Sequence, residues 1–176
     1  MDNNLIKNHK VLYTMEEIQK RIKELGEEIS NDYKGEELIV VCILKGAAFF
    51  TTDLVKNIDC EMIIDFMRVS SYTGTESSGI ITLKQDLEED IEGKNVLIVE
   101  DIIDTGRTLN TLKTELINRK PKSLKVVTLL DKKERRVVDL DADYVGFSIP
   151  NKFVVGYGFD IDEKYRNIPY IGYIEN

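Results

Sequence analysis

The segment that most constrains the fold is an uninterrupted apolar run, Val96–Val99, that leads directly into two adjacent carboxylates, Glu100 and Asp101. A continuous Leu/Ile/Val run is typical of a strand that is buried on both faces, as in a parallel sheet. Two ionised carboxylates at the end of such a strand are costly unless they face a cleft, a metal or hydroxyl groups. The segment therefore predicts a strand of a parallel sheet that ends at a polar site.

The turn after this strand carries groups that suit a phosphate. Asp104 is followed by Thr105, Gly106, Arg107 and Thr108, and the chain can then continue as a helix. The turn offers two hydroxyls, a flexible glycine, backbone N–H groups and a helix N-terminus, and this combination attracts a phosphate. Carboxylates beside a phosphate site predict a phosphorylated sugar whose hydroxyls are held by the acids.

The rest of the chain alternates between helix and strand patterns. Thr14 and Glu17 form a capping box, and apolar residues then recur at helical spacing as far as Ile29. Such alternation predicts a mostly parallel sheet with helices on both faces, in which ligands bind beyond the carboxyl ends of the strands. The expected helices are 15–29, 46–57 and 108–118, and the expected strands are 38–44, 61–69, 80–83, 96–99, 124–130, 144–149, 153–155 and 170–174.

Length and composition limit the classes of protein that remain. The 176 residues fit one domain over residues 1–176, with 42% hydrophobic residues for its core. The net charge of −8 disfavours a nucleic-acid surface, which needs clustered Lys and Arg, but it does not decide what a local site binds. Cys42 and Cys60 lack a metal-ligand spacing. We expect a cytoplasmic protein with no signal segment, no membrane span and no nucleic-acid partner.

The segment 96–109 resembles the phosphoribosyl-pyrophosphate motif of the type I phosphoribosyltransferases: an apolar strand, two acids, two apolar residues, one variable residue, Thr-Gly, and a Thr two residues later. An Asp at the variable position, Asp104, resembles the 6-oxopurine branch of that family. The resemblance implies an α/β type I phosphoribosyltransferase fold. Its central sheet would be mostly parallel and flanked by helices, with a small hood built from the chain termini.

The resemblance also implies roles for the residues of this motif. Residues 104–108 would bind the 5-phosphate of phosphoribosyl pyrophosphate through backbone N–H groups and the Thr105 and Thr108 hydroxyls. Glu100 and Asp101 would bind the ribose hydroxyls and help to organise Mg²⁺ as metal ligands, directly or through the sugar. Asp104 would be the catalytic residue that accepts the purine proton at N7; alternatively, it only orients the base.

Three further segments extend the resemblance. Lys45 and Gly46 follow the predicted strand 38–44 and would bind pyrophosphate. Ser71 and Tyr72 open a Ser/Thr/Gly-rich loop at about 70–80, which would be a flexible lid that excludes water from the reaction. Lys132 would donate to the purine O6 and so discriminate a 6-oxopurine from adenine.

The segment 149–167 is the second strong point of resemblance. Phe153 would stack on the purine, and the backbone around Val154 would contact its Watson–Crick edge. Asp160 would line the purine site and contact Mg²⁺, directly or through water, and Arg166 would face pyrophosphate. Oxygen ligands from a carboxylate, the substrate and waters are those that Mg²⁺ prefers. His9 lies outside every motif.

The implied activity is purine salvage: Mg²⁺-dependent transfer of phosphoribose from phosphoribosyl pyrophosphate to N9 of hypoxanthine or guanine, giving IMP or GMP and pyrophosphate. Family members commonly form homodimers or homotetramers. Three alternatives remain open: an enzyme that prefers xanthine, a non-catalytic nucleotide-sensing regulator on the same fold, and a receiver-type phospho-switch. The regulator would need a basic face for RNA, and the phospho-switch would lack the Thr-Gly-Arg-Thr phosphate site.

Overall fold

The computed structural model describes residues 9–71 and 81–175. The strands of its main sheet are β2 (Leu38–Leu44), β3 (Met62–Ser71), β4 (Ile81–Gln85), β5 (Asn95–Ile103), β6 (Ser123–Asp131) and β7 (Tyr144–Ser148). They lie in the order β4-β3-β2-β5-β6-β7, and all neighbours pair in parallel except β3 and β4, which are antiparallel. The mostly parallel sheet confirms the fold class predicted from the sequence.

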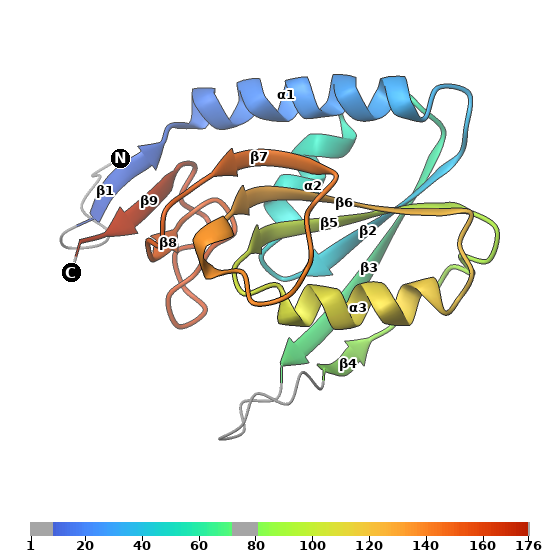
Figure 1. Ribbon diagram of the computed structural model, residues 1–176. Helices are drawn as coiled ribbons and strands as arrows, with labels where there is room; N and C mark the ends of the chain where they lie inside the picture. Colours follow the sequence, from blue (N-terminus) through green and yellow to red (C-terminus); the bar gives the residue numbers. More distant parts are fainter. Residues whose placement is uncertain (1–8, 72–80, 176) are drawn as a thin grey trace.

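Helices cover both faces of this sheet (Figure 1). Helices α1 (Met15–Asp32) and α2 (Ala48–Val55) lie on one face, and α3 (Arg107–Ile117) lies on the other. The predicted capping box is present at the start of α1, where the Glu17 backbone N–H donates to Thr14 Oγ1 (3.2 Å) and the Thr14 N–H donates to Glu17 Oε2 (2.8 Å). A short 3-10 turn, Lys133–Arg135, follows β6.

The core consists of two apolar layers, one on each side of β5. Leu97 and Val99 pack in the layer beneath α1 and α2, whereas Val96 and Ile98 pack in the layer beneath α3. Strand β5 is therefore buried on both faces, as its unbroken apolar run predicts. Strand β5 lies between two other strands of the parallel sheet, β2 and β6. A ligand would therefore meet β5 at its polar carboxyl end.

A second, antiparallel sheet forms the hood over the main sheet. It contains β1 (His9–Tyr13), β8 (Val154–Val155) and β9 (Ile171–Ile174), in the order β1-β9-β8. The strands come from the two ends of the described chain, and the carboxyl ends of β5, β6 and β7 point toward them (Figure 1). The hood thus confirms the expected contribution of the chain termini, and it closes the side of the sheet where the predicted site lies.

The boundaries of several elements differ from the sequence predictions. Strand β1 was not predicted, because its residues lack a clear alternation. In the hood, the ring of His9 stacks on Tyr170, and His9 Nε2 lies 2.6 Å from the Tyr170 hydroxyl. Strand β5 continues to Ile103 rather than ending at Val99. Tyr72 and most of the predicted lid lie outside the described residues, as does the side chain of Ser71.

Two of the expectations concern the whole chain. None of the helices in the described ranges is long and apolar enough to cross a membrane. The division of residues 1–176 into a single domain stays a prediction.

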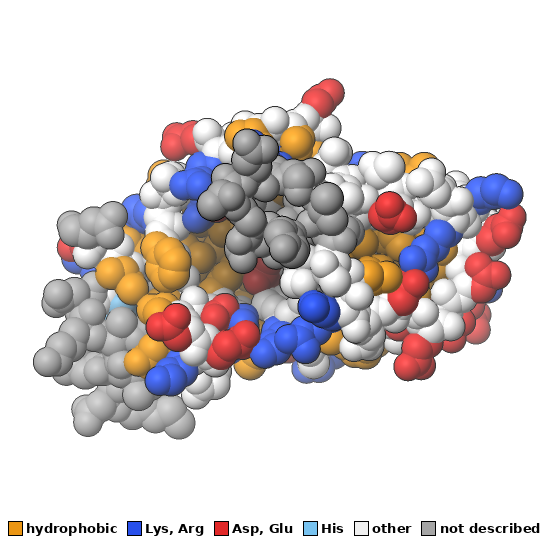
Figure 2. All heavy atoms as spheres, turned by 90° about the horizontal axis from the view of Figure 1, so that it is seen from below, with side chains coloured by type: hydrophobic (Ala, Val, Ile, Leu, Met, Phe, Trp, Pro, Cys, Tyr) orange, Lys and Arg blue, Asp and Glu red, His pale blue; other side chains and the backbone are white. Residues whose placement is uncertain are grey.

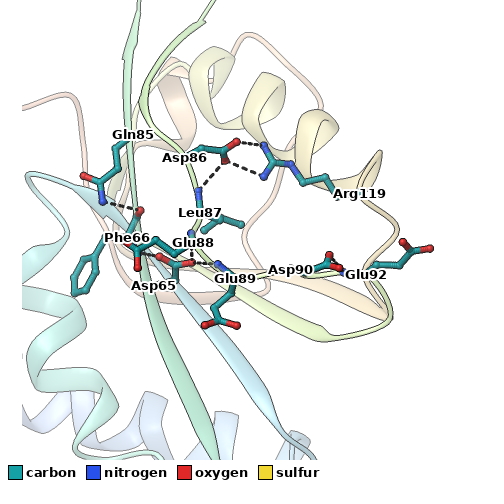
Figure 3. A network of polar contacts seen from close by, with 10 residues as sticks. All are labelled: Asp65, Phe66, Gln85, Asp86, Leu87, Glu88, Glu89, Asp90, Glu92 and Arg119. Atoms are coloured by element: carbon teal, nitrogen blue, oxygen red, sulfur yellow. Dashed lines mark hydrogen bonds and ion pairs between the residues drawn. The ribbon is translucent and has the colours of Figure 1, made fainter.

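A buried carboxylate, Asp65 on β3, fixes the segment that links β4 to β5 (Figure 3). Its Oδ2 accepts hydrogen bonds from the backbone N–H groups of Glu88 (2.8 Å) and Glu89 (2.9 Å), and its Oδ1 accepts one from Phe66 (2.7 Å). Hydrogen bonds to a charged acceptor are stronger than neutral ones. Asp65 therefore holds this acidic segment in place through the backbone of the segment, not through the segment's side chains.

We expect Asp65→Ala to lower the free energy of unfolding by about 2–4 kcal/mol, because three backbone N–H groups lose their shared acceptor, the buried Asp65 carboxylate. The matched control is Asp86→Ala, which removes a more exposed ion pair with Arg119 (2.8 Å) and should cost less than about 1 kcal/mol. Urea unfolding of both variants measures the difference. Equal losses would contradict the role of Asp65.

Candidate active site

The turn between β5 and α3 forms a pocket of about 120 Å³ at the carboxyl end of the sheet. Gly106 is the N-cap of α3 with a φ of 80°, and no described side chain caps the helix. The positive pole of α3 is therefore available to an anion. Arg107 is the first residue of α3 and points to the exposed surface. The pocket is lined by Glu100, Ile102, Ile103, Asp104, Thr105, Gly106, Thr108 and Leu109.

Three basic side chains surround Asp104. Arg135 Nε lies 2.7 Å from Asp104 Oδ1, Lys132 Nζ lies 3.9 Å from Oδ2, and Arg136 donates to the Asp104 carbonyl (3.1 Å). Lys132 is buried, and this burial lowers its pKa while the Asp104 charge opposes the shift. The structure thus brings together Asp104 and Lys132, two residues that the sequence separates by a strand and a helix. Arg136 also pairs with the buried Asp131.

The two acids at the end of β5 are partly buried and close to one another. Burial, with the neighbouring Asp101 charge, raises the pKa of Glu100 well above its usual range. Burial raises the pKa of Asp101 to about 6, although the Ile102 N–H (2.7 Å) and Arg166 both stabilise its charged form. The negative charge of Asp160 raises it further. The protein therefore supplies too little positive charge to offset the burial of these two carboxyls, and each holds its proton to a higher pH than an exposed carboxyl does.

Gly46 packs directly against Asp101. A Cβ atom on Gly46 would lie 1.6 Å from Asp101 Oδ2, and a Cβ atom on Gly158 would lie 2.2 Å from the Gly46 carbonyl oxygen. Gly158 has room only for glycine because its close neighbour is backbone, whereas a side chain at Gly46 would force the Asp101 carboxylate to move. The peptide bond between Leu44 and Lys45 is cis. Three segments that are far apart in the sequence thus meet at one point, beside the carboxyl end of β5.

Arg166 links the residues of the C-terminal segment. Its guanidinium donates to the Gly158 carbonyl (2.6 Å) and pairs with Asp160 (2.8 Å) and Glu163 (3.2 Å). Glu163 also pairs with Lys45 (2.9 Å). Within the described residues the Arg166 Nε atom is buried and has no hydrogen-bond partner. Arg166 is therefore linked to Lys45 through their shared partner Glu163, and it holds Asp160 beside them.

A larger pocket of about 360 Å³ lies beside this cluster. Four of its lining side chains are cationic and one is acidic, which favours an anionic ligand. Arg68 and Lys84 were not among the predicted site residues, because only the pairing of β3 with β4 brings them to this place. The pocket is lined by Leu44, Lys45, Arg68, Val69, Ser70, Lys84, Glu163 and Arg166.

The predicted purine-binding residues Phe153 and Val154 lie in the hood. Phe153 has 57% of its surface exposed, which is unusual for a large aromatic residue in a folded domain. Val154 is buried on β8 and pairs with Tyr173 of β9. The structure therefore leaves the Phe153 ring open to a ligand while the backbone of the next residue is fixed by the hood.

Some residues of the site could have been found from the sequence and others could not. Arg135 and Arg136 belong to a dense basic run that begins at Lys132. This run is the sequence feature from which their place in the site could have been predicted. Glu163 stands in the C-terminal segment that carries the resemblance, but nothing in the sequence pairs it with Lys45. On the face in Figure 2, basic and acidic side chains lie interspersed, so this face carries no single extended basic patch.

The fold and this site define a class of protein. The family described as "Phosphoribosyl transferase domain" matches residues 9–162, and the chain belongs to this family. Among its curated relatives are the hypoxanthine-guanine phosphoribosyltransferase of Staphylococcus aureus, 55% identical and covering 92% of this chain and 91% of the relative, and that of Streptococcus pneumoniae, 53% identical and covering 94% and 93%.

Solved structures agree with these relatives. A crystal structure of a hypoxanthine phosphoribosyltransferase from Staphylococcus aureus superposes with a TM-score of 0.92 and 53% identity, and the match covers 94% of this chain and 91% of the other. At this level of similarity the type I phosphoribosyltransferase fold is established for the chain. The earlier prediction of this family from residues 96–109 is confirmed.

The raised pKa of Asp101 predicts a pH dependence of stability. A carboxyl whose pKa is higher in the folded than in the unfolded protein makes the folded state lose stability as the pH rises from about 4 to about 6. We expect Asp101→Asn to remove part of this loss and to raise the free energy of unfolding at pH 7.5 by roughly 1–3 kcal/mol, with little change at pH 4. Urea unfolding across this range in a metal-free buffer provides the measurement. An equal effect at both pH values would show that the charge is not the cause.

Proposed function

We propose that this protein is a purine salvage enzyme that transfers phosphoribose from phosphoribosyl pyrophosphate to N9 of hypoxanthine or guanine. The observation that carries the proposal is the meeting of Asp104 and Lys132 beside the uncapped N-terminus of α3. The N-terminus of α3 suits a phosphate, and the adjacent Asp104 and Lys132 suit a purine with a proton at N7 and an oxygen at C6. The curated relatives with this name support the same reaction.

The phosphoribose is proposed to lie along the end of β5. Residues 104–108 bind the 5-phosphate through the backbone N–H groups at the start of α3 and the Thr105 and Thr108 hydroxyls, which line the smaller pocket. Glu100 and Asp101 accept hydrogen bonds from the ribose hydroxyls. Hydroxyl donors would offset the cost of holding two partly buried carboxylates so close together.

The purine is proposed to lie between β5 and the hood. Phe153 stacks on the ring with its exposed face, and the backbone at Val154 and the adjoining segment to Asp160 contact the Watson–Crick edge. Lys132 donates to O6, and an amino group at that position would leave this buried cation without an acceptor. Base selectivity therefore rests on Lys132.

The pyrophosphate is proposed to occupy the larger cationic pocket. The Lys45 and Gly46 backbone and the Arg166 guanidinium contact it, and the buried Nε of Arg166 provides a donor that has no partner among the described residues. Arg68 and Lys84 line the opposite part of the same pocket. These cations stabilise the charge that develops on pyrophosphate as it departs.

The residues present fit Mg²⁺ that binds together with substrate. In the described part of the chain no group of three His, Cys, Asp or Glu side chains forms a preformed metal cluster. Mg²⁺ is usually held by one or two carboxylates plus substrate phosphates and waters, and Glu100, Asp101 and Asp160 offer such carboxylates near one another. When bound, Mg²⁺ would supply positive charge to the pyrophosphate.

The chemical step breaks the bond between C1 of the ribose and the pyrophosphate oxygen and forms a bond between C1 and purine N9. The electron pair of the broken bond leaves with pyrophosphate, and the purine gives up its N7 proton. Asp104 accepts this proton as a general base, a role typically worth about 10²–10⁴-fold in rate. The alternative is that Asp104 only orients the base by a hydrogen bond.

The direct test is an assay with Mg²⁺, phosphoribosyl pyrophosphate and one of hypoxanthine, guanine, xanthine or adenine. We expect IMP and GMP to form, and adenine to give no nucleotide. A preference for xanthine would favour the xanthine-specific alternative. Failure with every base would refute the enzyme and leave the nucleotide-sensing regulator.

We expect Asp104→Asn to lower kcat by about 10²-fold or more, because the amide cannot accept a proton, while the dissociation constant for phosphoribosyl pyrophosphate changes by less than about three-fold. The matched control is Asp141→Asn, at an exposed position that lines neither pocket, which should leave kcat unchanged. Rapid-quench and binding measurements separate the two constants. Near-normal turnover of Asp104→Asn across the pH range would favour the orienting role.

A homodimer or homotetramer is proposed from an uncovered apolar area. Ile64 and Phe66 on β3 and Phe49 on α2 are 42%, 41% and 40% exposed. Ile64 and Phe66 share the face of β3 with Met62, which packs against the core beneath α1 and α2. Exposed apolar groups of this kind mark interfaces. We expect sedimentation to show more than one subunit for the native protein and a smaller species for Ile64→Lys. A native monomer would contradict this.

Two further proposals concern the lid and the location of the protein, and only the first rests on the resemblance. Ser71 and Tyr72 are proposed to belong to a lid over the pyrophosphate. The cytoplasmic location is proposed from the two free cysteines, Cys42, which is buried, and Cys60, which is partly buried.

A further inference from the structure

Tyr157 adopts a backbone conformation that large residues rarely adopt. Its φ is 48°, and its neighbours Gly156 and Gly158 have φ values of 90° and 99°. Three successive residues with positive φ form a tight turn, and only the two glycines adopt it without strain. A bulky residue persists in such a conformation where the surrounding structure holds it.

The side chain of Tyr157 is held by Asp53 of α2. The Tyr157 hydroxyl donates to Asp53 Oδ2 (2.7 Å), and the tyrosine has only 5% of its surface exposed. Asp53 also accepts from Gln19 of α1 (2.7 Å) and pairs with Lys56 (3.2 Å). The Asp53 carboxylate is therefore held by contacts with α1 and α2. Its hydrogen bond to the Tyr157 hydroxyl in turn restrains the 156–158 turn.

Backbone hydrogen bonds connect this turn to the segment that carries Arg166, on the side of the site proposed for pyrophosphate. The Tyr157 N–H donates to the Ile168 carbonyl (2.7 Å), and the Gly158 N–H donates to the Arg166 carbonyl (2.9 Å). The Arg166 guanidinium donates in turn to the Gly158 carbonyl (2.6 Å). The Cα atom of Gly158 packs against the Gly46 carbonyl so closely that no Cβ fits between them.

We propose that Asp53 is a positioning residue that, through Tyr157, aligns Arg166 with the Lys45-Gly46 loop for pyrophosphate binding. Helix α2 begins directly after this loop. Asp53 is therefore joined to the Lys45-Gly46 loop by the helix itself, and to the Arg166 segment by its hydrogen bond with Tyr157. The inference rests on the proposed function for the identity of the ligand. Asp53 itself touches no part of the cationic pocket.

The test compares Asp53→Ala, Asp53→Asn and Tyr157→Phe in the full chain. We expect Asp53→Ala and Tyr157→Phe to weaken Mg²⁺–pyrophosphate binding and to raise KM for phosphoribosyl pyrophosphate by about ten-fold, while KM for hypoxanthine changes by less than about two-fold. Asp53→Asn retains an oxygen that accepts from Tyr157, so it should remain close to the native protein. The double variant Asp53→Ala/Tyr157→Phe should be no worse than Asp53→Ala, because both changes remove the same interaction.

The matched control is Gln19→Ala, which removes a hydrogen bond of the same length to the same oxygen but leaves Tyr157 in place. We expect it to leave pyrophosphate binding unchanged. A weakening equal to that of Asp53→Ala would overturn the proposal, as would variants that lose thermal stability with all KM values unchanged. Tyr157→Phe decides the question if Asp53→Ala does not fold.

Calorimetry with Mg²⁺ and pyrophosphate separates this inference from the proposed function. If the native protein binds pyrophosphate but makes no nucleotide from any base, the proposed function fails and the variants still decide the role of Asp53. If the native protein binds no pyrophosphate, the inference is overturned.

Discussion

The site depends on the packing of the Gly46 backbone against the Asp101 carboxylate. Gly46 follows the carboxyl end of β2, and Asp101 lies near the carboxyl end of β5, its neighbour in the sheet. A methyl group on Gly46 would collide with Asp101 Oδ2. Gly158 then packs on the other side of Gly46. The contact of Gly158 with the Gly46 backbone is possible only with glycine, and a side chain on Gly46 would displace the Asp101 carboxylate. This packing brings the acids of β5, the Lys45 loop and the Arg166 segment within reach of one ligand, and every role proposed for them requires that convergence.

Much of the fold could be predicted because the core obeys simple periodicity. The unbroken run at Val96–Val99 indicated a strand buried on both faces, and the two apolar layers around β5 confirm it. The capping box at Thr14 marked the start of α1. Strand β1 was missed because it has no such pattern, and it is held mainly by pairing with β9, a contact between the two ends of the chain. Local sequence carries little information on a pairing that spans such a distance.

The same distinction separates the predicted site residues from the missed ones. Asp104 stands in a segment whose residue types already suggest a phosphate site, and Lys132 was predicted from the resemblance. The structure brings the Lys132 Nζ to 3.9 Å from Asp104 Oδ2. Arg68 and Lys84 are ordinary strand residues in the sequence, and they reach the cationic pocket only because β4 pairs antiparallel with β3. Asp53 is similar: it is one polar position of a short helix, and its contact with Tyr157 depends on how the C-terminal segment crosses α2.

The arrangement of charge in the site resolves the apparent conflict between an acidic chain and an anionic substrate. The net charge of −8 describes the whole surface, whereas binding depends on the local field. Acids gather in the middle of the site, where burial raises the pKa of Glu100 and Asp101. Cations line the larger pocket on one side, and the uncapped pole of α3 lies on the other. A ligand that matches this pattern has hydroxyl groups in its centre and phosphate at both ends, as phosphoribosyl pyrophosphate does. Because the proposed contacts to the sugar hydroxyls come from Glu100 and Asp101, exchanging these acids for apolar groups would remove the acceptors at the centre of the site while the cations at its ends remain.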